Sequence, residues 1–370
     1  MKITDITLDR LRLELNPPFH AAWDPEPRRH FDATIVRVHT DEGITGIGSG
    51  DLMDGFETYR HLFVGEDPLQ INRHVRAIET ANFHGAYYWP LEAALWDIIG
   101  KVHGRPVSEL FGNATRKLPA YASSGELKSP AERVAMALKA REAGFRALKI
   151  RIDRDRIDEG VAAVRAVREE LGSGFEIMVD LNQSWRMAGD TAHASDLAKT
   201  RKTIARLAEL DVFWVEEPLP YSDLDGFKAL RAENPGVRIA AGEMHHSPTE
   251  LLRHLEKDTL DIYQMDVVLA IGMHRARTLA ELAQLKNRQF TPHSWTNGIG
   301  VLANLHVAAG VGGGPFFEFP YDPPGWTPER RDFMLAEPVR VNSDGDLEVP
   351  DKPGLGIELD EDAIDRWRIK

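Results

Sequence analysis

Seven short apolar segments, each ending at or beside a charged or polar side chain, lie between residues 147 and 320: ALKIRID (147–153), IMVDLNQ (177–183), FWVEEP (213–218), IAAGEM (239–244), IYQMD (262–266), FTPHS (290–294) and FFEFP (316–320). Their polar positions follow one another at intervals of about 23 to 36 residues. A strand, a loop, a helix and a return loop need about that length when the strands run parallel. The pattern therefore predicts polar groups at one end of successive parallel strands, which is the end that carries chemistry in a βα-barrel.

The segment LPAYASSG (118–125) supplies one more strand before these seven, and apolar residues at helical spacing separate the strands. Seven strand–helix alternations followed by a final strand predict an α/β fold with a modified TIM barrel of the (β/α)7β type. Two barrel helices are predicted to begin with a capping box, because Ser129 and Ser247 are each followed by Pro and, three residues on, by Glu.

Two regions of different character flank the barrel. Residues 1 to about 50 alternate apolar and polar side chains, which predicts an antiparallel meander interrupted by a proline-rich loop, NPPFHAAWDPEPRRHF (16–31). Residues 56–112 are helical in pattern. We therefore expect an α+β capping domain over residues 1–115, the barrel over 116–334, and a tail over 335–370 that does not extend the barrel and returns to the capping domain.

Composition limits the classes of function. The 370 residues are 42% hydrophobic and 28% charged, as in globular enzymes, and include no cysteine, which excludes disulfides, thiolate nucleophiles and Cys-ligated metals. A net charge of −13 disfavours a nucleic-acid partner. The N-terminal residues show no signal-peptide pattern, and no apolar run is long enough to span a membrane. We expect a cytoplasmic enzyme whose substrate, if anionic, binds at a local concentration of positive charge.

Three acidic side chains, Asp180, Glu216 and Glu243, end consecutive predicted strands. Carboxylates brought this close repel one another unless a cation lies between them. Oxygen ligands with room for water or substrate favour Mg²⁺. We therefore predict a magnesium site, and we place Glu217 outside it, since strand alternation turns that side chain to the opposite side.

Basic groups face this site. Lys149 and Arg151 are two residues apart on one strand, so both point into the barrel mouth. Two cations opposite three carboxylates suit an anionic small-molecule substrate, although a plain salt bridge would produce the same pattern.

A possible catalytic base follows on the next strands. Asp266 and His293 end neighbouring strands, and a carboxylate bonded to one imidazole nitrogen makes the other nitrogen a competent base. Glu318, on the last strand, is expected either to be protonated and donate to a substrate oxygen, the reading that we prefer, or to form a salt bridge with Lys149. His245 and His246 offer a further ligand or acid, or face a loop.

Substrate-binding side chains are expected from two sources. The proline-rich loop offers His20, Trp23 and Arg28, unless it is only a solvated surface loop. The strand ends offer a polar mouth suited to a hydroxyl-rich ligand, with these residues: Asn182, Gln183, Ser184, Trp185, Ser294, Trp295 and Asn297.

In combination, these motifs resemble the enolase superfamily and, within it, the mandelate racemase-like group. The resemblance covers essentially the whole chain: ALWDIIGKVHGRPVSELFG (94–112), then LKIR, VDLNQ, VEEP, GE, QMD and PHS in that order, and PGLGIELD (353–360). It implies a Mg²⁺-stabilised enediolate, formed when a base removes the proton α to a carboxylate. It also implies that Asp180, Glu216 and Glu243 bind the metal, that Asp266 and His293 form the His–Asp dyad, and that residues 20–30 and 51–55 are specificity loops. Barrels of this group often assemble, so we expect a homo-oligomer.

One position departs from the pattern that the resemblance implies. Racemases of this group are expected to carry Lys-x-Lys on this strand, whereas this chain has Lys149 and Arg151. Arginine keeps its proton in proteins and is a poor base. Racemisation needs proton transfer on both faces of a carbon, whereas elimination needs one base. The sequence thus predicts an acid-sugar dehydratase that acts on an aldonic or aldaric acid and yields a 2-keto-3-deoxy acid.

Three alternatives were weighed against this prediction. A racemase or epimerase would require that Arg151 lower the pKa of Lys149 by like-charge repulsion, so that Lys149 serves as the second base. A metal-dependent amidohydrolase is disfavoured, because LPAYASSG lacks a His-x-His pair. A binding role without catalysis would fit a protein that fails to bind Mg²⁺.

Overall fold

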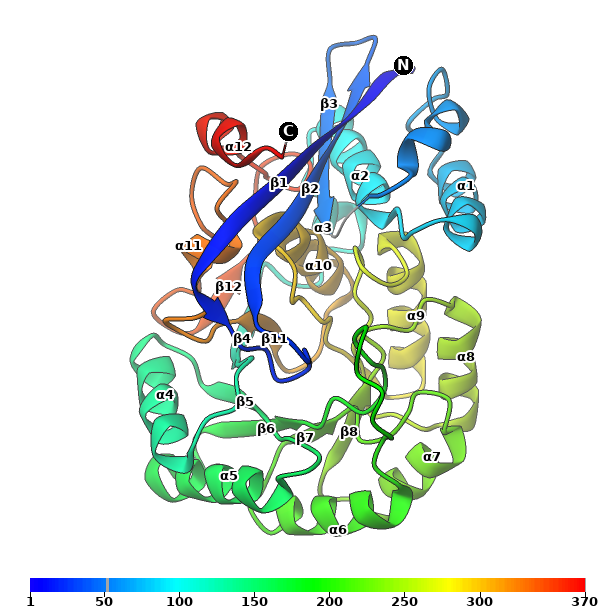
Figure 1. The fold of residues 1–370 in the computed structure, drawn as a ribbon. Helices are drawn as coiled ribbons and strands as arrows, with labels where there is room; N and C mark the ends of the chain where they lie inside the picture. The colour runs from blue at the N-terminus through cyan, green and yellow to red at the C-terminus, as the bar shows by residue number, and fades with distance from the viewer. Residues whose placement is uncertain (51–52, 370) are drawn as a thin grey trace.

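The computed structural model describes residues 1–50 and 53–369, and places a long antiparallel hairpin across the mouth of a barrel (Figure 1). Both chain termini lie on the capping side, and the barrel helices line the outer edge below. Asp51 and Leu52, which belong to one of the expected specificity loops, lie outside the described residues. No helix in the described part of the chain is long and apolar enough to cross a membrane.

The capping domain begins with the sheet β1-β2-β3 (Ile3–Phe19, Arg28–Thr40, Thr45–Gly50), in which both neighbouring pairs are antiparallel. The hairpin is longer than predicted. Strand β1 continues through Pro17 and Pro18 to Phe19, which pairs with Arg28 after an irregularity in register, so the loop shrinks to residues 20–27. Prolines are tolerated there because they lie within that irregularity, between the paired residues Glu14 and Phe19, where β1 makes no regular ladder bonds.

Helices complete the capping domain: the 3₁₀ turns η1 (Phe56–Thr58) and η2 (Arg60–Leu62), and the helices α1 (Ile71–His84), α2 (Trp89–His103) and α3 (Val107–Leu110). Helix α2 is buried on all sides from Trp89 to Gly100, as expected for a helix that is apolar all round. It packs directly on β3, where a Cβ at Gly46 or Gly48 would lie 2.1 or 2.0 Å from a carbonyl oxygen of α2. Glycine at these two positions therefore permits the close approach of α2 to the sheet.

The barrel strands form one sheet in the order β10-β9-β8-β7-β6-β5-β4-β11, all parallel. Thr291, just after β10, donates to the carbonyl of Phe316, just before β11 (3.0 Å), so the two outer strands meet. The strands are β4 (Lys117–Ser123), β5 (Ala147–Arg151), β6 (Glu176–Asp180), β7 (Trp214–Glu216), β8 (Arg238–Ala241), β9 (Ile262–Tyr263), β10 (Gln289–Phe290) and β11 (Phe317–Pro320). This is the predicted modified TIM barrel with an N-terminal capping domain.

The barrel helices cover the outside of the sheet: α4 (Pro130–Glu142), α5 (Ile157–Leu171), α6 (Leu197–Ala208), α7 (Leu224–Glu233), α8 (Pro248–Lys257), α9 (Met273–Leu285) and α10 (Gly298–Val311). Side chains from six consecutive strands fill the interior as one buried cluster: Tyr121, Ala147, Met178, Trp214, Ala240 and Ile262. The barrel is thus a packed core, which leaves its open end for chemistry.

Both predicted helix starts are confirmed, but only one of the two predicted capping boxes forms. Ser129 and Glu132 form the complete capping box at α4. Ser247 occupies the N-cap of α8, but its side chain makes no capping hydrogen bond. The backbone of Glu250 bonds instead to the carbonyl of Ser247 (3.1 Å), which satisfies the N–H that the serine hydroxyl was expected to cap.

The tail contains α11 (Pro328–Arg331), β12 (Asp346–Glu348) and α12 (Glu361–Trp367). Arg368 bridges to Leu11 on β1, and Glu361 accepts two hydrogen bonds from Arg37 on β2, so the end of the tail lies on the capping sheet. The expectation that the tail adds nothing to the barrel sheet is wrong. Strand β12 pairs antiparallel with residues 117–119 of β4, the part of that strand that β11 leaves unpaired.

Candidate active site

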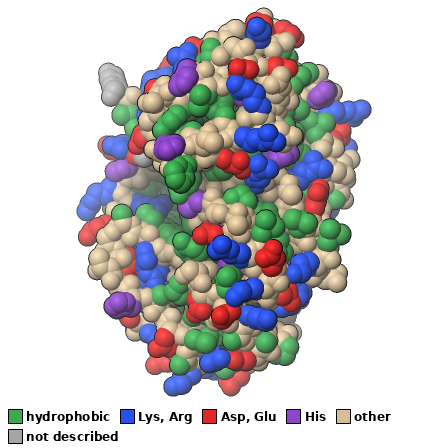
Figure 2. Space-filling model, turned by 90° about the vertical axis from the view of Figure 1, so that its right-hand side faces the viewer, with side chains coloured by type: hydrophobic (Ala, Val, Ile, Leu, Met, Phe, Trp, Pro, Cys, Tyr) green, Lys and Arg blue, Asp and Glu red, His purple; other side chains and the backbone are tan. Residues whose placement is uncertain are grey.

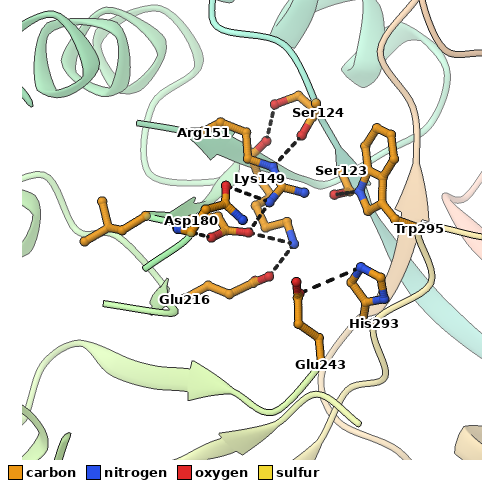
Figure 3. Close-up of polar contacts among 12 residues, drawn as sticks. Ser123, Ser124, Lys149, Arg151, Asp180, Glu216, Glu243, His293 and Trp295 are labelled. Carbon is orange, nitrogen blue, oxygen red and sulfur yellow. Dashed lines mark hydrogen bonds and ion pairs between the residues drawn. The ribbon is translucent and has the colours of Figure 1, made fainter. Parts of the chain in front are cut away.

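Three carboxylates converge at the open end of the barrel (Figure 3). Asp180 and Glu216 are paired neighbours at the ends of β6 and β7, and Glu243 follows β8. Each offers an oxygen within 4.8 Å of the others, and all three are buried. Indole N–H groups orient two of them: Trp185 donates to Glu243 (2.8 Å) and Trp214 to Glu216 (3.1 Å).

This donor set fits a hard divalent cation. Burial raises the pKa of Glu216 well above its usual value, and repulsion from the neighbouring carboxylates adds to the rise. The charge of Lys149 opposes both effects. One oxygen of Glu243, Oε2, is buried and has no hydrogen-bond partner in the described protein. A cation bound by oxygen ligands would relieve both the repulsion and the unpaired acceptor, and Mg²⁺ prefers such ligands.

Lys149 is the positive centre beneath these carboxylates. Its ammonium donates to Glu216 (2.5 Å) and Glu318 (2.7 Å) and lies 3.5 Å from Asp180. Burial alone would lower the pKa of Lys149, but Glu216 and Glu318 outweigh it and raise the pKa. This is opposite to the direction that a second base at Lys149 requires.

Glu318 forms the salt bridge with Lys149 rather than the protonated donor that the sequence led us to prefer. It accepts hydrogen bonds from Lys149, from the hydroxyl of Ser123 (2.8 Å) and from the backbone of Ser294 (2.6 Å). Burial would raise the pKa of Glu318, but Lys149 and His293 lower it to about 2. Glu318 is therefore an ionised acceptor in this structure and not the protonated donor that we expected. Hydrogen-bond donors from three segments stabilise its negative charge.

Arg151 is fixed rather than free. It pairs with Asp180 and donates to Asn182 (3.1 Å) and to the carbonyl of Ser124 (2.9 Å). Its guanidinium lies 4.4 Å from the ring centroid of Trp23, close enough for a cation–π contact. Burial would lower the pKa of Arg151, yet Asp180 and the other carboxylates raise it. Arg151 thus acts as a permanent cation.

His293 and Asp266 form the predicted pair. The Nδ1 atom of His293 lies 2.9 Å from Asp266 Oδ2, and its Nε2 atom faces Glu243 at 3.8 Å. Asp266 accepts a hydrogen bond from the N–H at Nδ1, which leaves Nε2 as the reactive nitrogen. Burial would lower the pKa of His293, but Glu243, Glu318 and Asp266 raise it to about 10. A cation on the carboxylates would oppose that rise and favour the neutral base.

A cavity of about 120 Å³ joins these groups, and its lining includes Arg151, Glu243 and His293. Four of the predicted substrate-binding residues line it: Trp23, Arg28, Trp185 and Trp295. Asn182 lines an adjoining cavity of about 270 Å³, which also contains Trp23. His20 does not line the central cavity; its side chain is exposed and its backbone donates to Glu126 (3.3 Å).

A larger cavity of about 750 Å³ continues outward and shares Arg28, Met187 and Leu269 with the central one. It lies between the capping loop and Tyr87, whose ring stacks on His246 with centroids 3.8 Å apart. Figure 2 shows a hollow on this side of the molecule where hydrophobic and histidine side chains gather. Substrate therefore has a path from the surface between the capping domain and the barrel.

The polar mouth is less extensive than predicted. Four of its expected members satisfy the protein's own polar groups. Gln183, Ser184 and Ser294 each donate to a backbone carbonyl, and Asn297 caps α10. Buried polar side chains must find partners, and here backbone groups supply them.

The two histidines after Glu243 lie apart from the three carboxylates. His245 contacts His254 on α8 (3.3 Å), and burial together with His254 lowers the pKa of His245 to about 3. His246 stacks on Tyr87. In this structure neither joins the carboxylate cluster.

The backbone conformation of Glu217 is not the extended one that strand alternation assumes. Its φ of +46° ends the strand geometry immediately after Glu216, so the period of two no longer sets its direction. Both of its carboxylate oxygens are buried without a hydrogen-bond partner among the described residues. It stays outside the group of three carboxylates.

The sequence reading missed several contributors. Ser123 joins Glu318 to the indole of Trp295 (2.8 Å), and Met187, Met244 and Leu269 line the cavity. Ser123 ends the first barrel strand, so the strand-end rule applied to LPAYASSG would have found it. The three apolar residues lie on loops and carry no comparable signal.

The comparisons with known proteins agree with this geometry. Residues 132–363 match the family described as enolase C-terminal domain-like, and residues 4–112 match the mandelate racemase / muconate lactonizing enzyme N-terminal domain. A 3,6-anhydro-alpha-L-galactonate cycloisomerase of Streptomyces coelicolor is 31% identical, with 92% of each chain covered. An arabinonate dehydratase of Saccharolobus solfataricus is 28% identical over 76% of this chain and 71% of its own.

Solved structures give the same result. A racemase from Streptomyces coelicolor A3(2) with bound magnesium superposes with a TM-score of 0.84 at 26% identity, over 99% of this chain and 100% of its own. The named relatives thus include a dehydratase, a cycloisomerase and a racemase. The chain belongs to the enolase superfamily, in its mandelate racemase-like group.

Proposed function

We propose that this protein is a Mg²⁺-dependent dehydratase that converts an aldonic or aldaric sugar acid into a 2-keto-3-deoxy acid. The observation that carries the proposal is the asymmetry of the site. His293 places its Nε2 atom on one side of the carboxylates, 3.8 Å from Glu243, and Arg151 holds a permanent positive charge on the other (Figure 3). One competent base supports elimination more readily than inversion of configuration.

The residues of this chain define the proton transfers. Nε2 of His293 accepts the proton from the carbon α to the substrate carboxylate, and the electron pair of the broken C–H bond moves toward that carboxylate. His293 then returns the proton to the hydroxyl on the neighbouring carbon when the geometry is syn, and the C–O bond breaks to release water. The enol that remains tautomerises to the 2-keto acid. Asp266 stabilises the imidazolium between the two steps.

The metal and the cations supply electrostatic stabilisation. Asp180, Glu216 and Glu243 would hold Mg²⁺, which when bound stabilises negative charge on the substrate carboxylate. Lys149 and Arg151 add positive charge in a buried site, where charge interactions are stronger than in water. These groups allow a protein of net charge −13 to attract an anionic substrate to this point.

The size and connection of the cavities support a chain-like substrate. The central cavity is small, about 120 Å³, but shares residues with both neighbouring cavities. A linear polyhydroxy acid can place its carboxylate near His293 and extend its hydroxyl groups outward. The dehydratase among the relatives acts on arabinonate, as its name states, which supports this substrate class.

A library of aldonic and aldaric acids tests the proposal. The protein with Mg²⁺ is incubated with each acid and 2-keto acids are assayed, with a chelator-treated sample as the control. We expect turnover of one or a few acids that depends on Mg²⁺. The absence of keto acid from every member, combined with inversion of configuration in any of them, would overturn the assignment in favour of a racemase or epimerase.

Mg²⁺ is also expected to stabilise the folded protein, because it binds the gathered carboxylates only when they are assembled. At a hundredfold excess over Kd the free energy of unfolding should rise by about 2.7 kcal/mol. Thermal unfolding with Mg²⁺, compared with Na⁺ at equal ionic strength, measures this effect. Identical unfolding midpoints in the two salts would argue against a metal site.

Trp23 is expected to contribute to substrate binding, since it lines the cavity and covers Arg151. Removing the ring in Trp23→Ala should raise KM about tenfold, in keeping with the loss of about 1–2 kcal/mol of cation–π and apolar contact. Trp23→Phe keeps an aromatic face and should raise KM much less. An unchanged KM in Trp23→Ala would remove this residue from the binding site.

A further inference from the structure

The turn that follows β9 fixes Asp266 mainly through its own backbone, with one longer contact from Asn304 Nδ2 on α10 to Oδ1 (3.4 Å). Oδ1 of Asp266 accepts hydrogen bonds from the backbone N–H groups of Val268 (2.8 Å) and Leu269 (2.9 Å). Only Oδ2 then remains for His293 (2.9 Å). The position of the imidazole therefore depends on the conformation of residues 266–272, here called the dyad turn.

The capping domain holds the far end of the dyad turn at Ala270 and the first turn of α9, just beyond it, at His274. The indole N–H of Trp89 donates to the carbonyl of Ala270 (2.7 Å). The carboxylate of Glu92 accepts from the backbone N–H of His274 (2.7 Å), in the first turn of α9. Both side chains come from α2 and are buried, so the contacts join two domains far apart in sequence.

Glu92 supplies a helix cap that α9 cannot provide for itself. The N-cap residue of α9 is Gly272, which has no side chain and a φ of +78°. The space a side chain would need is already taken, because a Cβ at Gly272 would lie 2.0 Å from Glu92 Oε2. An acceptor from α2 thus replaces the usual N-cap side chain and fixes where α9 begins.

Burying the carboxylate of Glu92 costs desolvation free energy, which suggests that a specific hydrogen bond requires it. Burial raises the pKa of Glu92 to about 7, although the N–H of His274 and the indole of Trp96 oppose the shift. An apolar residue would avoid that desolvation but would leave the N–H of His274 without its acceptor. Since the acceptor oxygen is what matters, glutamine should replace glutamate here.

We propose that Trp89 and Glu92 are positioning residues, which set the orientation of His293 by holding the dyad turn against the capping helix α2. The capping domain then determines the alignment of the base as well as covering the substrate. Only the expected change in kcat rests on the proposed function. The structural part, that the two residues control the bond between His293 and Asp266, is independent of the reaction.

Four variants test whether Trp89 and Glu92 position His293 or only hold the capping domain against the barrel. Trp89→Phe removes one hydrogen bond and keeps the ring, Glu92→Ala removes the cap, and Glu92→Gln retains an acceptor oxygen. The matched control is Asp97→Asn, also on α2, whose carboxylate accepts from Ile47 and Leu355 in β3 and the tail rather than from the dyad turn.

The direct readout is the Nδ1 proton resonance of His293 in histidine-labelled protein, assigned by its loss in His293→Asn. We expect this resonance to move upfield and to exchange faster with solvent in Trp89→Phe and Glu92→Ala, and to be restored in Glu92→Gln. With a substrate in hand, kcat should fall about tenfold in the first two variants while KM stays within about twofold. Asp97→Asn should leave both readouts near those of the unchanged protein.

The outcomes are distinguishable. An unshifted resonance in folded Trp89→Phe and Glu92→Ala would overturn the inference, and so would an equal shift in Asp97→Asn. If Glu92→Ala fails to fold, Trp89→Phe decides the question alone. If no sugar acid is turned over, the dehydratase proposal fails while the resonance still tests the positioning role.

Discussion

Replacing His293 with Asn is expected to lower kcat by about 10⁴-fold, near the upper limit of what a single acid–base group contributes. The expected loss is large because the same imidazole accepts the α-proton and then protonates the leaving hydroxyl. Steady-state kinetics on the acid identified by the library give the value.

Asparagine occupies nearly the same volume as part of the imidazole and can still bond to Asp266, so the fold should persist. Mg²⁺ titration of His293→Asn is the control and should give an affinity within a few-fold of the unchanged protein. Turnover that survives the substitution to within tenfold would mean that another group removes the proton.

Glu243→Gln is expected to weaken Mg²⁺ binding by at least about 100-fold. Substitution of residues that merely support metal ligands typically costs 10- to 100-fold in affinity, and Glu243 is itself an expected ligand. Its oxygen Oε2 has no protein partner, which makes it the carboxylate most dependent on a cation. Calorimetric titration with Mg²⁺ measures the change.

Glu217→Gln provides a matched control. It replaces a carboxyl group that is as buried as that of Glu243 and adjacent to Glu216, yet lies outside the group of three. Its Mg²⁺ affinity should stay close to that of the unchanged protein. Equal weakening in both variants would show that Mg²⁺ binding does not distinguish Glu243 from a neighbouring carboxyl group outside the group of three.

The strand-end pattern in the sequence was enough to predict the barrel and to group its polar residues. Parallel strands carry their C-terminal residues to one edge, so Asp180, Glu216 and Glu243 had to meet once the spacing was recognised. The same rule brought Asp266 and His293 together. These features follow from local periodicity, which a single sequence contains.

The strand-end pattern could not predict features that depend on which hydrogen-bond partner a polar group finds in the folded protein. The charge state of Glu318 follows from three donors on separate segments, and the Ser247 hydroxyl makes no cap bond at the start of α8. The polar mouth is less extensive than predicted for the same reason, since Gln183 and Ser184 donate to backbone carbonyls, although Gln183 still lines the cavity of about 270 Å³. The bond between Glu92 and His274 joins residues 182 positions apart, a distance over which periodicity carries no information.

Proton exchange in D₂O tests the central claim most directly. With the accepted sugar acid and Mg²⁺, the account predicts that recovered substrate keeps its configuration at the α-carbon and that the keto acid accumulates. Recovery of deuterated substrate with both configurations at that carbon would contradict it, because a second proton-transferring group must then act on the face assigned to Arg151.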